Sequence, residues 1–281
     1  MPTQRATNFQ QPARIVSLVP SLTQTLCEFG LKEQIVGCTG FCIDPPDLRR
    51  LVTNCGGTKT PELEIIRNLR PTHILVNSEE NTAEHIAVLR EVAPVLETRP
   101  ETVQDVAPMI EDMGRFLNCV DTAHTMAVRV EAALVELASS AASTSPPERH
   151  NRMLAMIWRT PWMIAGTDTY MSSLLEAAGF VNASRDLANP ETRTRYPAVT
   201  INEIHDCHPD EIFLASEPWP FRKRDVEALM REFAEAGVAH PPRCSWIDGK
   251  LLTWFGALTA DAAGALAAYR RGQPSEMIRP F

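Results

Sequence analysis

Apolar and polar residues follow one another along the chain in a pattern that predicts short strands, each followed by a helix. Short apolar runs predict strands at 14–19, 35–38, 73–77, 153–158, 163–165, 211–215 and 244–247. Apolar residues that recur every three or four positions predict helices at 21–29, 62–69, 103–120, 170–178, 225–234 and 261–269, with a phase slip near Asn118 in the third of them. Strands that alternate with helices in this order pair in parallel. The pattern therefore predicts an α/β protein with mainly parallel sheets.

The longest helical pattern covers residues 121–142, which contain no Gly or Pro and consist mostly of strong helix formers. One apolar stripe runs along it through Met126, Val130, Leu134 and Leu137. A helix of this length spans about 33 Å. Similar strand and helix patterns precede and follow it, so we predict one long backbone helix that joins two α/β lobes.

These patterns also predict the domain boundaries. We expect an N-terminal lobe at 14–120, the linking helix at 121–142, a C-terminal lobe at 143–272, and tails at 1–13 and 273–281.

Composition narrows the class of partner. Acidic residues outnumber basic ones by 35 to 27 and give a net charge of −8, which disfavours binding to nucleic acid through its phosphates. No run approaches the roughly 18 apolar residues that a membrane-spanning helix needs. The first fourteen residues lack the apolar segment of a signal peptide, so we expect a cytoplasmic location as the chain is written, and a periplasmic one if its start is trimmed or misassigned. A small ligand or a protein is the expected partner.

Signatures of enzyme chemistry are missing from the chain. It contains no GxSxG, GxGxxG, Walker or HExxH motif, and its seven histidines are scattered. Its seven cysteines include no CxxC pair, which is typical of reduced thiols that pack as small apolar side chains. Cys38 and Cys42, with three residues between them, are the better thiol candidates for a soft ligand. We predict no catalytic residue and no metal site.

Aromatic and polar side chains gather in the loops expected at the ends of strands. In the first lobe these are Phe41, Lys59, Glu80 and Asn81. In the second lobe they are Trp158, Arg159, Trp162, Glu217, Trp219, Phe221 and Trp254. Aromatic faces with a few fixed polar groups suit a large, flat, partly apolar ligand in a cleft. The alternative is that the rings pack the ends of the lobes.

Several short segments share their order and spacing with a known family. They are Arg14–Ser21, Asp44–Pro46, Gly56–Thr58, Arg70–Leu75, Ala165–Gly166 with Tyr170, Tyr196–Pro197, Pro209–Ile212, Ser216–Pro218, and Asp248–Gly249 with Trp254. In these segments the chain resembles the helical-backbone (class III) substrate-binding proteins, and among them the branch of cobalamin-binding proteins and helical-backbone metal receptors. The resemblance covers roughly residues 14–270.

This resemblance implies two α/β lobes joined by one rigid helix, with a ligand held in the cleft between them. It implies a non-enzymatic receptor for a cobalamin-like corrinoid, haem or a ferric siderophore, which serves an ABC importer or is a cytosolic relative of such receptors and has no intrinsic cofactor. In the family a glutamate on each lobe docks onto arginines of the permease. Glu64 matches the first glutamate, whereas Asn202 stands at the second position and Glu203 follows it.

Two alternatives to this function stay open. One is an enzyme or chaperone that acts on a metallated cofactor in the cytoplasm, which would need a residue pair poised for proton transfer. The other is a purely structural interaction protein, and the aromatic loops argue against it.

Overall fold

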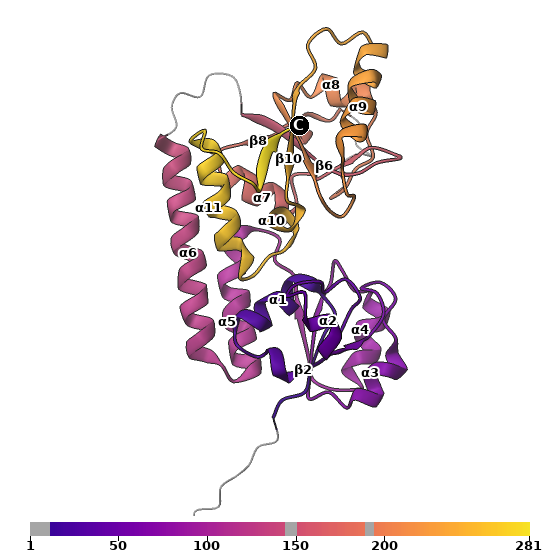
Figure 1. The fold of residues 1–281 in the computed structure, drawn as a ribbon, viewed down its shortest axis with the longest axis vertical. Helices are drawn as coiled ribbons and strands as arrows, with labels where there is room; N and C mark the ends of the chain where they lie inside the picture. Colours follow the sequence, from indigo (N-terminus) through magenta and orange to yellow (C-terminus); the bar gives the residue numbers. More distant parts are fainter. Residues whose placement is uncertain (1–11, 144–150, 189–193) are drawn as a thin grey trace, which may run out of the picture. The chain divides into compact units, whose positions relative to one another are not determined.

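The computed structural model describes residues 12–143, 151–188 and 194–281 (Figure 1). The chain divides into two compact units. Unit 1 lies within Met1–Arg99 and Arg115–Cys119, and unit 2 lies within Pro100–Gly114 and Val120–Phe281. Helix α5 contributes residues to both. None of the helices in the described ranges combines the length and the apolar character that a membrane crossing needs.

Unit 1 is built on a parallel sheet of short strands. The strands are β1 Ile15–Ser17, β2 Ile35–Cys38, β3 Thr53–Asn54, β4 His73–Asn77 and β5 Val95–Thr98. Their order is β3-β2-β1-β4-β5, and every neighbouring pair is parallel. The helices are α1 Pro20–Glu28, α2 Leu48–Leu51, α3 Leu63–Leu69 and α4 Ala83–Arg90, with a 3-10 turn at Lys32–Gln34.

The apolar character of these strands comes from burial of both faces of the sheet. Val16 on β1 and Ile74 and Val76 on β4 pack in one cluster with Ile66 of α3 and Leu89 of α4. Because successive strand residues point to opposite faces, α3 and α4 cover the face that these residues share. Continuous apolar runs are expected of strands in such a sheet.

Unit 2 is built on a mixed sheet. Its strands are β6 Arg152–Trp158, β7 Met163–Ile164, β8 Val181–Asn182, β9 Glu211–Ala215, β10 Arg243–Ile247 and β11 Ile278–Pro280. Their order is β11-β10-β9-β6-β7, with β8 paired to β6. Strands β6, β8, β9 and β10 are parallel, whereas β7 and β11 are antiparallel to their neighbours.

The remaining helices belong wholly or partly to unit 2. They are α5 Val106–Leu117, α6 Val120–Ser143, α7 Tyr170–Ala177, α8 Ile201–Asp206, α9 Lys223–Glu235, α10 Gly249–Thr253 and α11 Leu258–Arg270, with 3-10 turns at Val103–Asp105 and Ala183–Asp186. Leu154 and Met156 of β6 pack with Ile212 of β9 and with Leu229 and Phe233 of α9. Helix α9 therefore covers one face of the central strands.

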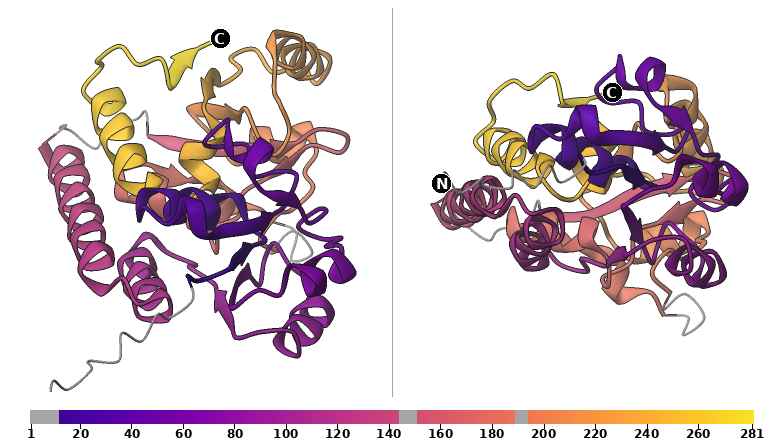
Figure 2. Two further views of the ribbon diagram at one scale, coloured as in Figure 1. Left: turned by 60° about the horizontal axis from the view of Figure 1, so that its bottom comes forward. Right: turned by 90° about the horizontal axis from the view of Figure 1, so that it is seen from below.

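The long helix α6 lies side by side with α11 within unit 2 (Figures 1 and 2). Ala123 and Ala127 are buried on α6, and α11 is itself rich in alanine, so the two backbones approach closely. Arg129 Nη2 of α6 is 2.7 Å from Asp261 Oδ1 of α11. This packing explains why the apolar stripe of residues 121–142 is buried along much of its length.

The predicted fold class is confirmed, and the long helix predicted at 121–142 is α6. The helix predicted at 103–120 breaks at Asn118, whose φ of 57° is in the left-handed region that asparagine tolerates. Helix α4 and strand β5 were not predicted. Most of the tail expected at 1–13 lies outside the described residues, as do residues 144–150 near the start of the lobe expected at 143–272.

The loose tail predicted at 273–281 is wrong for its last residues. Ile278–Pro280 form β11, and Ile278 is buried opposite Ile247 of β10. A strand of three residues with a proline gives too short an apolar pattern to be recognised in the sequence.

Candidate ligand-binding edges of the two units

The candidate ligand residues of each unit follow the carboxyl ends of parallel strands. In unit 1 the loops after β1, β2 and β4 leave the same edge of the sheet, because these strands are parallel. In unit 2 the same holds for β6, β9 and β10. Open α/β sheets bind ligands outside this edge, at the point where the strand order reverses. There the connection after one strand leads to one side of the sheet, and the connection after its neighbour leads to the other side. In unit 1 that point lies between β1 and β4.

Asn81 ties two loops of the unit 1 edge together. Its Oδ1 accepts a hydrogen bond from the backbone N of Asn77 at 3.0 Å, and its Nδ2 donates to the carbonyl of Thr58 at 2.8 Å. The side chain is buried. Sequence reasoning placed Asn81 among the ligand contacts, but these bonds occupy both ends of its amide. The structure gives it a positioning role for the loops at 56–60 and 78–82.

Lys59 and Glu80 bring opposite charges to this edge. The ammonium of Lys59 donates to the carbonyl of Glu79. Burial raises the pKa of Glu80, while the charge of Lys59 and a hydrogen bond with Thr58 act in the opposite direction. A carboxyl group in this setting can accept from a ligand when charged, or donate to it when protonated.

Phe41 presents an aromatic ring in the loop after β2. The backbone N of Gly40 donates to the carbonyl of Gly56 at 2.9 Å, which fixes the base of the loop. A Cβ placed on Gly57 would lie 3.5 Å from Cε2 of Phe41, so the ring leans on the glycine segment. The residue is nonetheless 61% exposed. An exposed phenylalanine on a fixed loop is a ready apolar contact for a ligand.

Trp158 and Trp219 form an aromatic pair at the unit 2 edge. Trp158 is the last residue of β6, and Trp219 lies in the loop after β9. Their ring centroids are 5.0 Å apart and the ring planes meet at 70°, an edge-to-face contact. Trp158 is 39% exposed. Trp219 Nε1 is buried and has no hydrogen-bond partner among the described residues.

Glu217 lies beside this pair in the loop after β9. Burial raises the pKa of its carboxyl group, and hydrogen bonds with Thr253 and Trp254 oppose that rise. Thr253 Oγ1 donates to Glu217 Oε1 at 2.8 Å. A Cβ placed on Gly249 would lie 2.5 Å from the backbone N of Glu217, so only glycine fits at the start of α10. The ring of Trp254 is buried.

Arg159, Trp162 and Phe221 pack inside unit 2. The rings of Trp162 and Phe221 are buried in the cluster under α9, stacked with centroids 6.4 Å apart. Trp162 Nε1 donates to Glu232 Oε2 at 2.8 Å. The guanidinium of Arg159 lies 5.5 Å from the Trp162 ring centroid and pairs with buried Asp225. For these residues, and for Trp254, the structure agrees with the alternative in which the aromatic loops pack the ends of a lobe.

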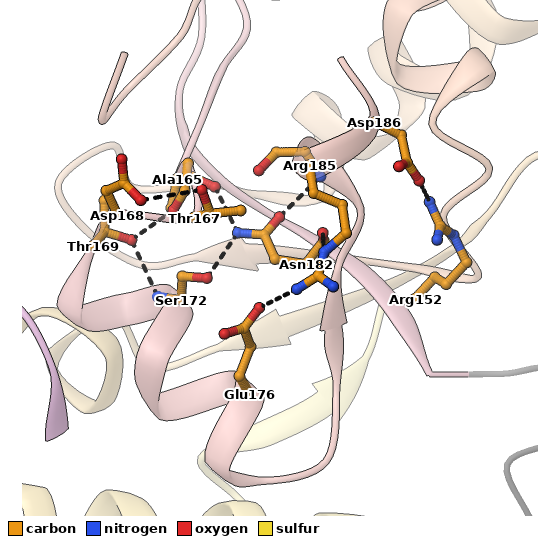
Figure 3. A network of polar contacts seen from close by, with 12 residues as sticks. Arg152, Ala165, Thr167, Asp168, Thr169, Ser172, Glu176, Asn182, Arg185 and Asp186 are labelled. Atoms are coloured by element: carbon orange, nitrogen blue, oxygen red, sulfur yellow. Dashed lines mark hydrogen bonds and ion pairs between the residues drawn. The ribbon is translucent and has the colours of Figure 1, made fainter. Parts of the chain in front are cut away.

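A polar network that sequence reasoning missed orders the segment before α7 (Figure 3). Asn182 Nδ2 donates to the carbonyl of Ala165 at 3.1 Å and to Ser172 Oγ at 3.0 Å. Thr169 Oγ1 accepts from the backbone N of Ser172 at 3.1 Å and caps α7. The only sequence signal was Thr169 directly before the predicted helix. The network fixes the loop between β7 and α7.

The two glutamates considered for permease docking differ in their surroundings. Glu64 is in the first turn of α3, where its side chain is 79% exposed beside Arg67. Glu203 Oε2 accepts from both the backbone N and Oγ1 of Thr200 at 2.8 Å, which makes it part of the capping box of α8. Asn202 is exposed. Both carboxylates therefore have a partner on or next to their own helix, Arg67 for Glu64 and Thr200 for Glu203, and Glu64 is the more exposed of the two.

The residues at 12–143, 151–188 and 194–281 contain no group of three or more His, Cys, Asp or Glu side chains that could hold a metal ion.

Comparison with known proteins extends these observations. The model of a family described as "Periplasmic binding protein" matches residues 15–238. A "Cobalamin-binding protein" of Halobacterium salinarum is 27% identical over 207 residues, which are 72% of this chain and 53% of that protein. The "Uncharacterized ABC transporter substrate-binding lipoprotein YvrC" of Bacillus subtilis is 23% identical over 72% of this chain and 63% of its own length. The chain thus spans about half the length of the first of these relatives and under two thirds of the second.

The fold is also shared with solved structures. A periplasmic haem-binding protein from Pseudomonas aeruginosa superposes with a TM-score of 0.79 at 18% identity, over 96% of this chain and 98% of that one. At this identity the likeness concerns the fold alone.

Proposed function

Because the chain belongs to the periplasmic binding protein family, we propose that it is a solute receptor that binds a cobalamin-like corrinoid, or another metal chelate such as haem or a ferric siderophore, without transforming it. The observation that carries this proposal is the partly exposed Trp158, held edge to face by Trp219 in the loop that also carries the half-buried Glu217. An aromatic face next to a few fixed polar groups suits a large planar ligand.

The proposed contacts are a subset of the candidates from the sequence. Phe41, Trp158 and Trp219 supply apolar faces, and Lys59, Glu80 and Glu217 supply polar anchors. Asn81, Arg159, Trp162, Phe221 and Trp254 support these groups from behind.

Membership of a family of binding proteins favours a receptor over an enzyme or chaperone that acts on a metallated cofactor. The "Cobalamin-binding protein" of Halobacterium favours a corrinoid among the possible chelates. Its level of identity leaves the central metal and the side groups of the ligand to experiment.

We further propose that the receptor serves an ABC importer on the outer side of the membrane. The family description and the ABC transporter lipoprotein of Bacillus support this location over the cytoplasmic one expected from residues 1–14. Glu64 is the side chain of this protein that we propose docks onto an arginine of the permease. At the second position Asn202 is neutral, and Glu203 would have to leave Thr200 to pair with an arginine.

The test is a titration of the purified protein with cobalamin, cobinamide, hemin and a ferric siderophore, followed by visible absorption and tryptophan fluorescence. We expect saturable quenching by one ligand, and at least tenfold weaker binding by Trp158→Ala. Trp246→Phe is the matched control, because Trp246 lies on β10 under the guanidinium of Arg279, 4.5 Å from its ring centroid. No response to any of the four ligands would contradict the proposal.

A further inference from the structure

The indole N–H of Trp219 is a polar group of the unit 2 edge that the fold does not use. Trp219 lies in the loop after β9, and its Nε1 is buried with no hydrogen-bond partner among the described residues. An indole N–H can only donate, and a buried one usually has an acceptor. Trp162 shows the usual arrangement, because its Nε1 donates to Glu232 Oε2 at 2.8 Å. A buried donor without an acceptor destabilises the folded state, so a role in binding is the natural reason to keep it.

The loop that carries Trp219 is held on both sides of this residue. Its backbone N donates to the carbonyl of Ile157 at 3.3 Å, and its carbonyl accepts from the backbone N of Phe221 at 2.9 Å. Pro218 and Pro220 flank it, and a proline ring restricts the backbone φ angle. The loop therefore has little freedom to turn the indole toward an acceptor within the protein.

Trp158 is the aromatic neighbour of Trp219 and the more exposed of the two residues. The pairing of β6 with β7 is irregular between Met156 and Trp158, and an irregularity of this kind re-aims a side chain. In the turn that follows, Thr160 has a φ of 66°, which is unfavourable for a β-branched residue. Such backbone conformations are concentrated at ligand sites. A ligand at the unit 2 edge therefore meets the ring of Trp158 before that of Trp219.

We propose that the N–H of Trp219 is a hydrogen-bond donor kept for the ligand, and that it binds an oxygen atom on the rim of the flat chelate. This inference rests on the proposed receptor function and adds a polar role to a ring that also supplies an apolar face. Because Nε1 is buried in the free protein, a side chain has to move before the ligand reaches it. Trp158 is the group that moves, since it is the more exposed ring of the pair.

This donor makes the receptor selective for the chemistry of the ligand's rim. The buried N–H has no hydrogen bond to lose when the ligand binds, and its loop is already fixed, so the new bond costs little ordering. A flat ligand with an apolar rim leaves the donor unpaired and binds more weakly. The oxygen is an amide carbonyl in a corrinoid and a carboxylate in haem, and either can accept from an indole.

Trp219→Phe keeps an aromatic ring and removes the donor. Binding of cobalamin, cobinamide, hemin and a ferric siderophore to this variant is followed by visible absorption, which does not depend on the number of tryptophans. We expect the ligand that binds wild type to bind the variant about tenfold more weakly, and the identity of that ligand tells an amide oxygen from a carboxylate. Trp246→Phe is the matched control, because Trp246 lies on β10 beside Arg279, and it should bind like wild type. Circular dichroism checks that both variants are folded.

Nuclear magnetic resonance of the indole groups separates a hydrogen bond from a change in packing. Protein labelled with nitrogen-15 gives one indole signal for each of its five tryptophans, and the signal missing from Trp219→Phe belongs to Trp219. The ligand is used in a diamagnetic form, as a cobalt(III) corrinoid or with gallium in place of iron. We expect the Trp219 proton to move downfield at saturation, as a proton does when it forms a hydrogen bond. The Trp162 proton, which is already bonded to Glu232, should stay in place.

The outcomes distinguish a failure of this inference from a failure of the receptor function. If none of the four ligands binds wild type, both are wrong. If a ligand binds and Trp219→Phe keeps the full affinity, the receptor function stands and the proposed donor does not. A loss of affinity in Trp219→Phe without a downfield shift of the Trp219 proton in wild type would assign the loss to packing, and it would overturn the proposal as well.

Discussion

The guanidinium of Arg159 pairs with the carboxylate of Asp225, a side chain that is completely buried at the start of α9. The other carboxylate oxygen of Asp225 accepts from the backbone N of Arg222 at 2.8 Å and caps the same helix. One acidic side chain therefore joins the loop after β6 to α9. Arg159 was expected to anchor a ligand, but its charge already has a partner inside unit 2.

We predict that Arg159→Ala destabilises the protein by about 3 kcal/mol, because it leaves the Asp225 carboxylate buried without its counter-charge. Urea unfolding followed by circular dichroism measures this loss. The matched control is Arg129→Ala, whose pair with Asp261 is about half exposed and should contribute about 0–1 kcal/mol. Equal, small losses in both variants, with ligand binding abolished only by Arg159→Ala, would make Arg159 a ligand contact instead.

The sequence predicted the buried strands and the long helix because their patterns are local. β4 is a continuous apolar run, and α6 carries an uninterrupted stripe. β5 escaped notice because it lies at the edge of its sheet, where Val95 and Leu96 are only half-buried and Glu97 is exposed. Its pattern therefore resembles that of a loop.

The candidate site was harder to predict because burial of a loop depends on distant segments. Trp162 and Trp158 are both aromatic residues beside a proline-containing turn, and nothing local distinguishes them. Packing of α9 over Trp162, with Glu232 as the acceptor for its indole, makes it a core residue. No comparable element covers Trp158 within unit 2. Residue type drew attention to both loops, and only tertiary packing distinguished the exposed rings from the buried ones.

Gly249 should be intolerant of any side chain. A Cβ there would come within 2.5 Å of the Glu217 backbone N and 2.7 Å of its carbonyl O, and neither backbone atom can move independently of the loop. We predict that Gly249→Ala costs about 1–3 kcal/mol and weakens ligand binding, because the loop that carries Glu217 and Trp219 must shift. Thermal unfolding and the fluorescence titration measure the two effects.

Gly264→Ala is the control for this substitution. Gly264 lies inside α11, and a Cβ there would have nothing within 4 Å. Alanine is the better helix former, so this variant should gain up to about 1 kcal/mol and bind ligand normally. If Gly249→Ala were as stable as Gly264→Ala, this result would contradict the prediction that the Glu217 backbone leaves no room for a side chain at position 249.

The last prediction concerns the pH dependence of stability at the unit 1 edge. Burial raises the pKa of Glu80 in the folded protein, so the unfolded chain loses this proton first as the pH rises. The contribution of Glu80 to folding is therefore greatest below the pKa of an unfolded glutamate, about 4.3, and falls as the pH rises through the folded pKa. Glu80→Gln cannot titrate. Its free energy of unfolding, relative to wild type, should accordingly increase from pH 4 to pH 8.

Glu84→Gln is the control with the opposite sign. Hydrogen bonds to its own backbone N and to Thr82, in the first turn of α4, lower the pKa of Glu84. Its carboxylate therefore stabilises the folded state above the unfolded pKa, and this stabilisation is lost as the pH falls through the folded pKa. Relative to wild type, Glu84→Gln should become less stable from pH 4 to pH 8. Each comparison uses the difference in the free energy of unfolding between a variant and wild type, so the contributions of the other carboxyl groups cancel. If this difference changed in the same direction with pH for both variants, Glu80 would not be desolvated in the folded protein.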